Sequence, residues 1–266
     1  MSVNVAPMKD AADLIYSQFG RPRKTFGDER IIVWFSCGAA SAFLAKIMVP
    51  YGAEVVHCDT TRDEHPDNLR FYNDVQDWIG QEIKSVRNMN YPGGIDEVFA
   101  NTKYMAGIAG ARCTVELKKG PRIDYQQPTD IHCFGYTSDE VKRAKRMEDN
   151  NPELRLMWPL IDKGVTKEDC LLMLKRAGIE LPTMYKLGFK NNNCLGCVKA
   201  TSPKYWNQIR RHFPAAFKER AERSRELGVR LTRYKGERIF LDELPPDSQE
   251  DFFEDLSCGP QCIPNP

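Results

Sequence analysis

Nine cysteines in a chain of 266 residues are the feature of this sequence that points most directly to chemistry. The sequence starts without a basic segment followed by a long apolar stretch, so we expect no secretory signal and a cytoplasmic location. In that reducing compartment, cysteines stay thiols unless they bind metal or take part in redox chemistry. Three of them lie inside apolar patterns and are predicted to be buried core thiols: Cys58, Cys133 and Cys170. Five others have polar or glycine neighbours and need another explanation: Cys113, Cys194, Cys197, Cys258 and Cys262.

The segment Cys194-Leu195-Gly196-Cys197 has the spacing of a metal-binding turn. Two cysteines three positions apart in a glycine-containing loop can direct both thiolates at one ion. A pair alone does not complete a tetrahedral sulfur site, so two further ligands are needed, and the other three polar-flanked cysteines are the candidates. Four thiolates suit either iron–sulfur or zinc. The alternative without metal is that all five cysteines are free thiols.

Apolar periodicity predicts the elements that must position these groups. An apolar run at 31–36, a turn of small residues and an amphipathic stretch predict a strand, a tight loop and a helix. Further strands are expected at 53–59, 83–88 and 130–136, and further helices at 66–78 and 138–148. Because strands alternating with helices form a parallel sheet covered on both faces, we predict an α/β fold. Ligands in such sheets bind at the carboxyl ends of the strands, where Ser36, Asp59 and Gly135 lie.

The character of the sequence changes after about residue 160. We expect a helix at 166–179, a loop at 191–200, two helices at 204–213 and 215–227, and a hairpin at 229–244. The predicted organisation is an N-terminal extension (1–29), a nucleotide-binding domain (30–160) and a cysteine-containing helical and hairpin region (161–266).

The predicted strand–loop–helix at 31–48 contains Ser36-Cys37-Gly38-Ala39-Ala40-Ser41. Such a loop presents backbone N–H groups at a helix N-terminus, where the helix dipole favours an anion. Gly38 permits close backbone approach, and the two serine hydroxyls can add donors. A Walker A loop is excluded because Gly-Lys-Ser/Thr is absent. The alternative is a tight connection filled with small residues for packing.

The spacing Ser-x-Gly-x-x-Ser after a buried strand resembles the PP-loop of the adenine-nucleotide alpha hydrolases and the phosphoadenosine-phosphosulfate reductase family. Ala40 stands where many ATP-using members have Asp, which brings the loop nearer to the sulfonucleotide-binding variants. Asp59-Thr60-Thr61, followed by Glu64-His65-Pro66, resembles the family segment that ends the second strand. Arg112-Cys113-Thr114, with Leu117-Lys118, resembles the Cys-Thr-x-x-Leu-Lys signature of reductase-like members. Together with Glu140 and Arg143, these blocks span about residues 30–200.

The resemblance implies a PP-loop fold and roles for individual residues. Asp59 and Thr60 would meet the adenine or help to hold Mg²⁺, and Arg112, Lys118 and Arg143 would contact phosphate or sulfate oxygens. A [4Fe–4S] cluster on Cys113, Cys194, Cys197 and Cys258 is implied, with zinc as the alternative metal. Ser257-Cys258-Gly259-Pro260-Gln261-Cys262 resembles the reductase C-terminus, whose cysteine attacks the sulfate sulfur, so Cys258 and Cys262 are the candidate nucleophiles.

The leading expected function is reduction of an adenylyl sulfate or phosphoadenosine phosphosulfate, with thioredoxin or glutaredoxin releasing sulfite. One alternative is an ATP pyrophosphatase that adenylates a nucleic-acid or small-molecule acceptor before sulfur transfer, with a cysteine desulfurase as a further partner. In that case Lys199, Lys204, Arg210 and Arg211, interleaved with Tyr205, Trp206 and His212, would form a nucleic-acid face unless Trp206 lies in the core. Another alternative is a non-catalytic nucleotide-binding subunit. A homo-oligomer is compatible with all three.

Composition limits the partners. The formal net charge is only +1, so no whole-molecule field favours nucleic acid or an anionic membrane, and any anion site must be local. No apolar run approaches the length of a membrane span, so no membrane partner is expected. Hydrophobic content of 41% and charged content of 28% are ordinary for a globular protein.

Overall fold

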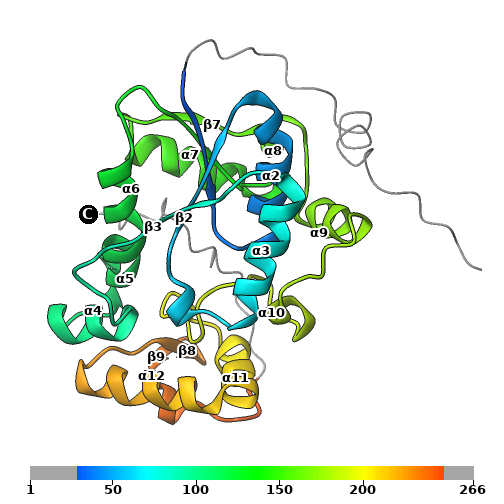
Figure 1. Cartoon of the computed structure of the whole chain (residues 1–266). Coiled ribbons are helices and arrows are strands. Elements are labelled where there is room, and N and C mark those ends of the chain that lie inside the picture. Colours follow the sequence, from blue (N-terminus) through cyan, green and yellow to red (C-terminus); the bar gives the residue numbers. More distant parts are fainter. Residues whose placement is uncertain (1–28, 249–266) are drawn as a thin grey trace, which may run out of the picture. The chain divides into compact units, whose positions relative to one another are not determined.

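A computed structural model describes residues 29–248, which include a five-stranded parallel sheet with flanking helices (Figure 1). The strand order is β3-β2-β1-β6-β7, so the first strand of the described residues lies at the centre of the sheet. This arrangement confirms the predicted α/β class. Of the predicted N-terminal extension (1–29), only residue 29 is described. Cys258 and Cys262 lie outside the described residues.

The elements have the following bounds. The sheet consists of β1 (Ile31–Phe35), β2 (Glu54–Cys58), β3 (Lys84–Val86), β6 (Ile131–Phe134) and β7 (Arg155–Met157), and the remaining strands form two hairpins, β4 (Ala106–Gly107) with β5 (Gly110–Ala111) and β8 (Thr232–Tyr234) with β9 (Glu237–Ile239). The helices are α2 (Ala39–Met48), α3 (Asp67–Ile79), α4 (Ile95–Thr102), α5 (Arg112–Thr114), α6 (Gly120–Tyr125), α7 (Val141–Asn150), α8 (Pro159–Asp162), α9 (Lys167–Arg176), α10 (Thr183–Lys186), α11 (Pro203–His212) and α12 (Pro214–Glu226).

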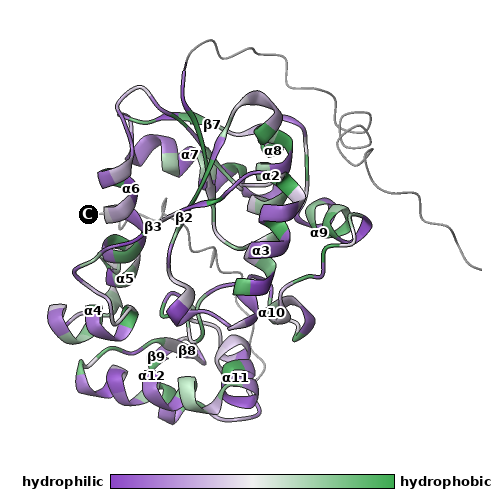
Figure 2. Cartoon of the chain, in the orientation of Figure 1, coloured by the Kyte–Doolittle hydropathy of each residue, from purple (hydrophilic) through white to green (hydrophobic). Residues whose placement is uncertain are grey.

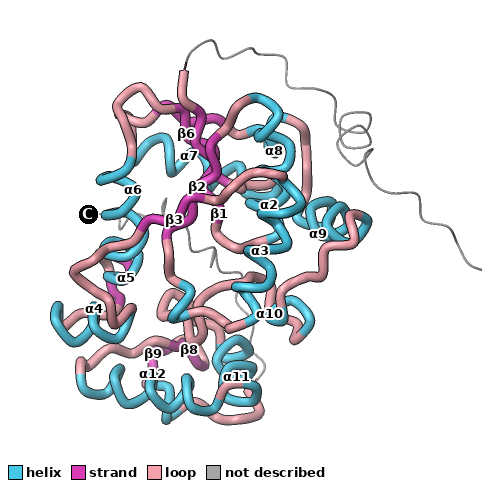
Figure 3. The backbone as a smooth tube through the Cα atoms, viewed as in Figure 1, coloured by secondary structure: helices cyan, strands magenta, loops and turns pink. Residues whose placement is uncertain are grey.

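The central strand β1 is apolar along its whole length, as expected for a strand covered on both faces. Every residue of β1 and of β6 is buried. β1 pairs in parallel with β2 on one side and β6 on the other, with Val33 opposite both Val55 and Cys133 (Figure 3). This register brings the loops that follow β1 and β6 to the same edge of the sheet.

The predicted strands at 31–36, 53–59, 83–88 and 130–136 correspond to β1, β2, β3 and β6. The helix expected from 66 is α3, and the one expected at 138–148 is a short 3-10 turn (Ser138–Glu140) continued by α7. β7 is not among the predicted strands, because it is only three residues long and these are exposed or half-buried.

The described chain divides into two compact units, each discontinuous in sequence. The first comprises residues 29–57, 71–84 and 127–181, and the second comprises 58–70, 85–126 and 182–248. In the first unit, α2 packs against β1 and α9, and nine of its ten residues are buried. Figure 2 shows hydrophobic colours along the strands of this unit. The predicted boundary near residue 160 stays a prediction.

The second unit has its own core, built mainly from helices. Trp206 of α11 is fully buried, its indole N–H donates to the carbonyl of Ala200, and its ring meets Phe217 of α12 edge-on. Both predicted helices of this region are present as α11 and α12, and the predicted hairpin is β8–β9. Trp206 is thus a core residue, as the packing alternative predicts, and is unavailable to stack on a nucleic-acid base.

Within residues 29–248, no helix is both long and apolar enough to cross a bilayer.

Candidate functional site

The loop after β1 has a defined hydrogen-bonded shape. The Ser41 hydroxyl donates to the Gly38 carbonyl at 2.9 Å and accepts from the Ser36 amide at 3.1 Å. The two serine hydroxyls are 3.2 Å apart. Because a hydroxyl has one proton and that of Ser41 goes to Gly38, Ser36 is the donor in this last contact. Ser41 therefore closes the loop, and only by giving up its bond to Gly38 could it donate to a phosphate.

The backbone of this loop is strained at Cys37, not at Gly38. Cys37 has φ +54° and is completely buried, whereas Gly38 is extended at φ −102° and ψ 157°. A non-glycine residue in the left-handed region costs energy and marks sites whose shape the fold imposes. From the residue types, conformational freedom is expected at Gly38. The left-handed backbone of Cys37 could not be predicted, because nothing in this residue type signals such a backbone angle.

The loop opens onto the N-terminus of α2. Gly38 is the N-cap residue, no side chain caps this end, and the first turn contains no acidic residue. The positive end of a ten-residue helix therefore receives no negative charge from its own first turn. Ala39 and Ser41 are buried, whereas Ser36 and Gly38 are half-exposed. Anion binding at this loop stays a prediction.

The strand end of β6 packs directly against the same helix turn. A Cβ atom at Gly135 would lie 2.7 Å from the Ser41 nitrogen and 2.8 Å from its Cα. Only glycine allows this approach without displacing one of the two backbones. Of the strand-end residues predicted to converge, the structure brings Ser36 and Gly135 to the first turn of α2.

Arg143 is held rigidly on α7 in the first unit. Its guanidinium lies 4.3 Å from the centre of the Tyr136 ring and donates to the Glu140 carboxylate at 2.6 Å. Tyr136 stacks in turn on Trp158, with ring centres 5.0 Å apart. Arg143 is mostly buried. Its charge is therefore partly neutralised by Glu140, and its role at a phosphate stays a prediction.

Asp59 and Thr60, which follow β2, belong to the second unit. The Asp59 carboxylate accepts from both the amide and the hydroxyl of Thr61, at 3.0 and 2.6 Å. Thr60 donates to the Glu64 carboxylate at 2.6 Å, and Asn68 donates to its other oxygen at 2.7 Å. Glu64 is 5% exposed. This buried carboxylate, bound by two neutral side chains, could not be predicted from the sequence.

Arg112, Cys113 and Lys118 lie on the turn formed by α5 and a π-helical segment (Val115–Lys119). Arg112 is exposed and pairs with Glu116 at 2.6 Å. Lys118 is buried, and its carbonyl accepts from the Cys58 thiol at 3.4 Å. Burial raises the pKa of Cys58 to about 12, although the charges of Lys118 and Arg122 oppose that rise. Lys118 and Arg122 are both buried, and the positive charge of each acts on the Cys58 thiol.

All three cysteines predicted to be core thiols are buried. Burial raises the pKa values of Cys58, Cys133 and Cys170, so these thiols stay protonated at neutral pH. A protonated thiol is a poor nucleophile and a poor metal ligand. The predicted burial of these three thiols is confirmed. Their lack of reactivity stays a prediction.

Two hydrogen bonds anchor the Cys194–Cys197 turn within the second unit. The Leu195 amide donates to the Asp63 carbonyl at 2.9 Å, and the Cys197 amide donates to the Tyr205 hydroxyl oxygen at 2.7 Å. Burial, followed by the charge of Cys197, raises the pKa of Tyr205 well above its usual range, and Cys194 adds to the rise. Both cysteines of the turn are buried, each only 6% exposed.

Arg220 of α12 lies against the same turn. A Cβ atom at Gly196 would meet Arg220 Cγ at 2.8 Å and Nε at 3.6 Å, and Gly196 has φ +66°. Arg220 is 4% exposed, and one of its terminal nitrogens pairs with Asp96. Its Nε is buried and has no hydrogen-bond partner among residues 29–248. A buried N–H without an acceptor is costly, and a thiolate or sulfide at the cysteine turn would supply one.

The metal centre expected at the Cys194–Cys197 turn stays a prediction. An anionic group with sulfur ligands would suit the two thiols of this turn. It would also supply an acceptor for Arg220 Nε, which lies beside Gly196 and has no partner among the described residues. However, no cluster of three or more His, Cys, Asp or Glu side chains within 29–248 is placed to hold a metal ion. Cys113 packs instead against the hydrophobic core of the second unit. A complete centre would need ligands from elsewhere, and Cys258 and Cys262 lie outside the described residues.

The predicted site residues therefore form two groups. The first unit contains Ser36, Cys37, Gly38, Ala39, Ala40, Ser41 and Arg143, and the second contains Asp59, Thr60, Arg112, Cys113, Lys118, Cys194 and Cys197. A scan against protein-family models finds no match to this chain, and a search of curated proteins finds no significant relative. A functional proposal rests on the residues themselves.

Proposed function

We propose that this chain is a sulfonucleotide reductase-like enzyme of the PP-loop class, which binds an adenine nucleotide and performs thiol-dependent sulfur chemistry. The observation that carries the proposal is the loop after β1. Its backbone is held by Ser36, Gly38 and Ser41 at the uncapped N-terminus of α2. A fixed set of backbone N–H groups at the positive end of a helix binds phosphate without any charged side chain.

The nucleotide phosphates would lie against residues 36–41. The close approach of Gly135 to Ser41 supports this assignment, because it fixes the first turn of α2 against β6. Arg143, held by Tyr136 and Glu140, is the candidate cation of the same unit for the sulfate or phosphate oxygens. The contacts of Asp59, Thr60, Arg112 and Lys118 with substrate are predictions that follow from the sequence resemblance.

In the proposed reaction, the thiolate of Cys258 attacks the sulfur of the adenylyl sulfate. An S–S bond forms as the bond between sulfur and the bridging phosphate oxygen breaks, and the electron pair leaves with the nucleotide phosphate. A second thiol, Cys262 or an external dithiol such as thioredoxin, then attacks the Cys258 sulfur. Sulfite leaves and a disulfide forms, so the dithiol is the reductant. Nearby cations favour the thiolate form of the nucleophile.

The second unit would hold the metal group on Cys194 and Cys197. Arg220 Nε is the candidate donor to a thiolate of this turn, which would supply the acceptor that the described residues lack. A bound iron–sulfur cluster or zinc ion would fix the two thiolates in one geometry and add positive charge beside them. Zinc and iron–sulfur both suit thiolate ligands.

A second candidate uses the same loop for ATP. The loop would hold pyrophosphate while the chain adenylates an acceptor, and a cysteine-borne sulfur would displace AMP. A basic pocket in the second unit, described below, favours this candidate because it could receive an anionic acceptor. A non-catalytic nucleotide-binding subunit is the remaining alternative.

The products released from each nucleotide distinguish the reductase, the ATP pyrophosphatase and the non-catalytic subunit. Protein purified without oxygen would be incubated in parallel with adenylyl sulfate, its 3′-phosphate and ATP, each with thioredoxin as reductant. The reductase proposal predicts sulfite and a nucleotide monophosphate (or bisphosphate) from one of the sulfonucleotides. Pyrophosphate from ATP, with no sulfite from either sulfonucleotide, would favour the second candidate. Binding without any product would favour the non-catalytic subunit.

A further inference from the structure

A pocket of about 800 Å³ lies within the second unit. Three segments far apart in the sequence form its wall: the β4–β5 hairpin at 106–111, the segment that follows the cysteine turn at 198–201, and the segment at 228–231. Arg238 and Phe240, at the end of the β8–β9 hairpin, complete it. Its volume is in the range of pockets that hold a ligand as large as a nucleotide.

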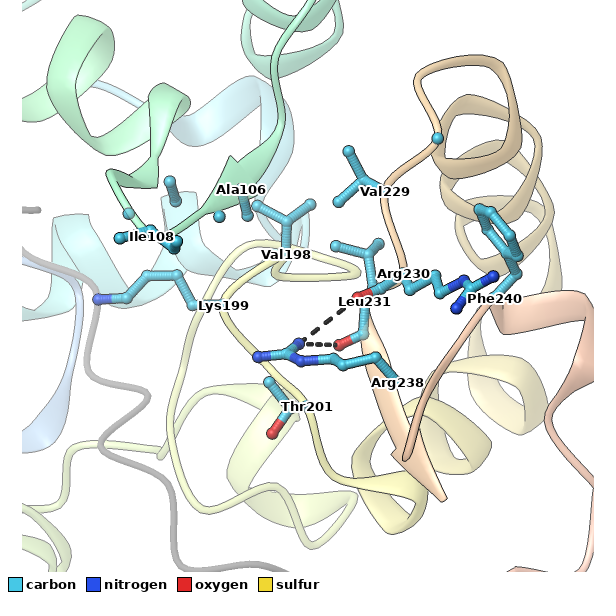
Figure 4. Close-up of a pocket in the computed structure, with 14 residues that line it drawn as sticks. Ala106, Ile108, Val198, Lys199, Thr201, Val229, Arg230, Leu231, Arg238 and Phe240 are labelled. Carbon is cyan, nitrogen blue, oxygen red and sulfur yellow. Dashed lines mark hydrogen bonds between the residues drawn. The ribbon is translucent and has the colours of Figure 1, made fainter. Parts of the chain in front are cut away.

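The floor of this pocket is apolar. Figure 4 shows Val198, Val229 and Leu231 at its centre, with Ala106 beside them. Ile108, at the tip of the β4–β5 hairpin, also lines the pocket and is 93% exposed. A single exposed isoleucine is ordinary, but here it adjoins an apolar concave surface. The flat face of a base could bury this surface.

The rim of the pocket is basic. Lys199, Arg230 and Arg238 line it, and none of the described residues that line it is acidic. Figure 4 shows Lys199 and Arg230 on opposite sides and Arg238 between them. The Arg238 guanidinium donates to the carbonyls of Arg230 and Leu231, at 3.5 and 3.1 Å. This cation is therefore positioned before any ligand arrives, which lowers the entropic cost of binding.

The β8–β9 hairpin brings two arginines together. Arg233 lies directly opposite Arg238 in the antiparallel register, and both residues are exposed. Like charges at such a cross-strand position repel each other and destabilise a hairpin. An anion bound beside them would remove that repulsion.

The surrounding sequence is basic well beyond the pocket. Residues 198–240 contain twelve Lys and Arg residues and four Glu residues, whereas the whole chain has a net charge of only +1. Some of these cations are neutralised, as in the pair of Arg220 with Asp96 and that of Arg225 with Asp242. The exposed arginines of the β8–β9 hairpin extend the positive surface past the pocket rim, which indicates a polyanion and not a single phosphate.

We propose that this pocket binds a single-stranded nucleic acid. The phosphates would contact Lys199, Arg230 and Arg238, and an unstacked base would lie on the apolar floor beside Ile108. Guanidinium groups match phosphate oxygens in pairs, and a base supplies the planar apolar surface that a carboxylate-rich peptide lacks. The proposal requires neither of the reactions described above, because binding can be measured without turnover.

The test measures fluorescence anisotropy of labelled 20-nucleotide strands, one of DNA and one of RNA, with the full chain at two salt concentrations. Wild-type protein should bind at least one strand, and the affinity should fall as salt rises. Arg230→Gln and Lys199→Gln should each weaken binding by about tenfold, because each removes a charge-assisted contact. Lys142→Gln, which removes an exposed charge from α7 in the other unit, should bind like wild type.

Circular dichroism would establish that each variant is folded. Arg238 is not used as the primary variant because its guanidinium supports the backbone of 230–231. Tighter binding of one strand would identify the source as DNA or RNA. Two results overturn the proposal. The first is that wild-type protein binds neither strand, whether or not it binds poly-glutamate, and the second is unchanged affinity in the folded Arg230 and Lys199 variants.

Discussion

Gly135 leaves no space for a side chain next to Ser41, since a Cβ atom there would lie 2.7 Å from the Ser41 nitrogen. This contact joins the end of β6 to the first turn of α2, the turn that we assign to nucleotide phosphates. Gly135→Ala should therefore displace one of the two backbones. We expect a loss of about 1–3 kcal/mol of unfolding free energy, together with weaker nucleotide binding.

Urea denaturation and nucleotide titration would measure both effects. Gly120→Ala is the matched control, because the nearest atom to a Cβ there lies at an ordinary 3.5 Å. Its stability and affinity should stay close to those of wild type. Equal behaviour of the two alanine variants would contradict the assigned role of Gly135.

Ser41 and Ser36 should respond differently to removal of the hydroxyl. Ser41→Ala removes the acceptor of the Ser36 amide and the bond to Gly38, so it should cost about 1–3 kcal/mol of stability as well as affinity. Ser36→Ala removes one contact of a half-exposed hydroxyl, so it should cost less than about 1 kcal/mol. Chemical denaturation of both variants would show the difference. If Ser41→Ala lowered affinity at unchanged stability, its hydroxyl would be a ligand and not the closure of the loop.

The cysteine turn is expected to lose metal on substitution. Cys194→Ser and Cys197→Ser each remove a thiolate that we propose binds the metal, so iron, sulfide or zinc per chain should fall to background after purification without oxygen. Cys170→Ala is the control, because this thiol is buried in the first unit and its pKa is raised to about 12. The control should keep its metal. Full retention in both serine variants would exclude a metal site at this turn.

The raised pKa of Asp63 predicts that the free energy of unfolding depends on pH. Burial raises its pKa to about 6, although its carboxylate accepts from the Ile95 amide at the start of α4. Because the folded pKa lies above the ordinary value of 3.8, the stabilising contribution is complete below pH 4 and is lost as pH rises towards 6. The total loss should be at most about 3 kcal/mol.

Asp63→Asn keeps an oxygen for Ile95 and removes the titration. Denaturation midpoints of this variant should change less between pH 4 and pH 6 than those of wild type. Identical pH profiles would show that Asp63 titrates at its ordinary value.

Much of the first unit could be predicted from the sequence because its signals are local. The apolar run of β1, the small residues after it and the amphipathic α2 lie within eighteen consecutive positions. The parallel sheet then follows from the alternation of strands and helices. β7 could not be predicted because three residues at the edge of the sheet, one exposed and two half-buried, are too few to show a strand pattern.

The features missed at the candidate sites depend on contacts between distant residues. Glu64 is buried because Asn68 and Thr60 satisfy its oxygens, and Asn68 in turn accepts from Asn192 at 2.9 Å. Arg220 meets the cysteine turn only because α12 packs there, more than twenty residues later in the chain. No local pattern encodes either arrangement, and the left-handed backbone of Cys37 has no signature in its residue type.

The central claim is that an adenine nucleotide binds with its phosphates on residues 36–41. Calorimetric titration of adenylyl sulfate and ATP into wild-type protein and Gly38→Val tests it most directly. Gly38 has an extended backbone that any residue can adopt, so the variant should fold, while its side chain would block approach to the α2 N-terminus. The account predicts saturable binding by wild type and none by folded Gly38→Val. Equal affinity in the two proteins, or no binding of either nucleotide by wild type, would contradict it.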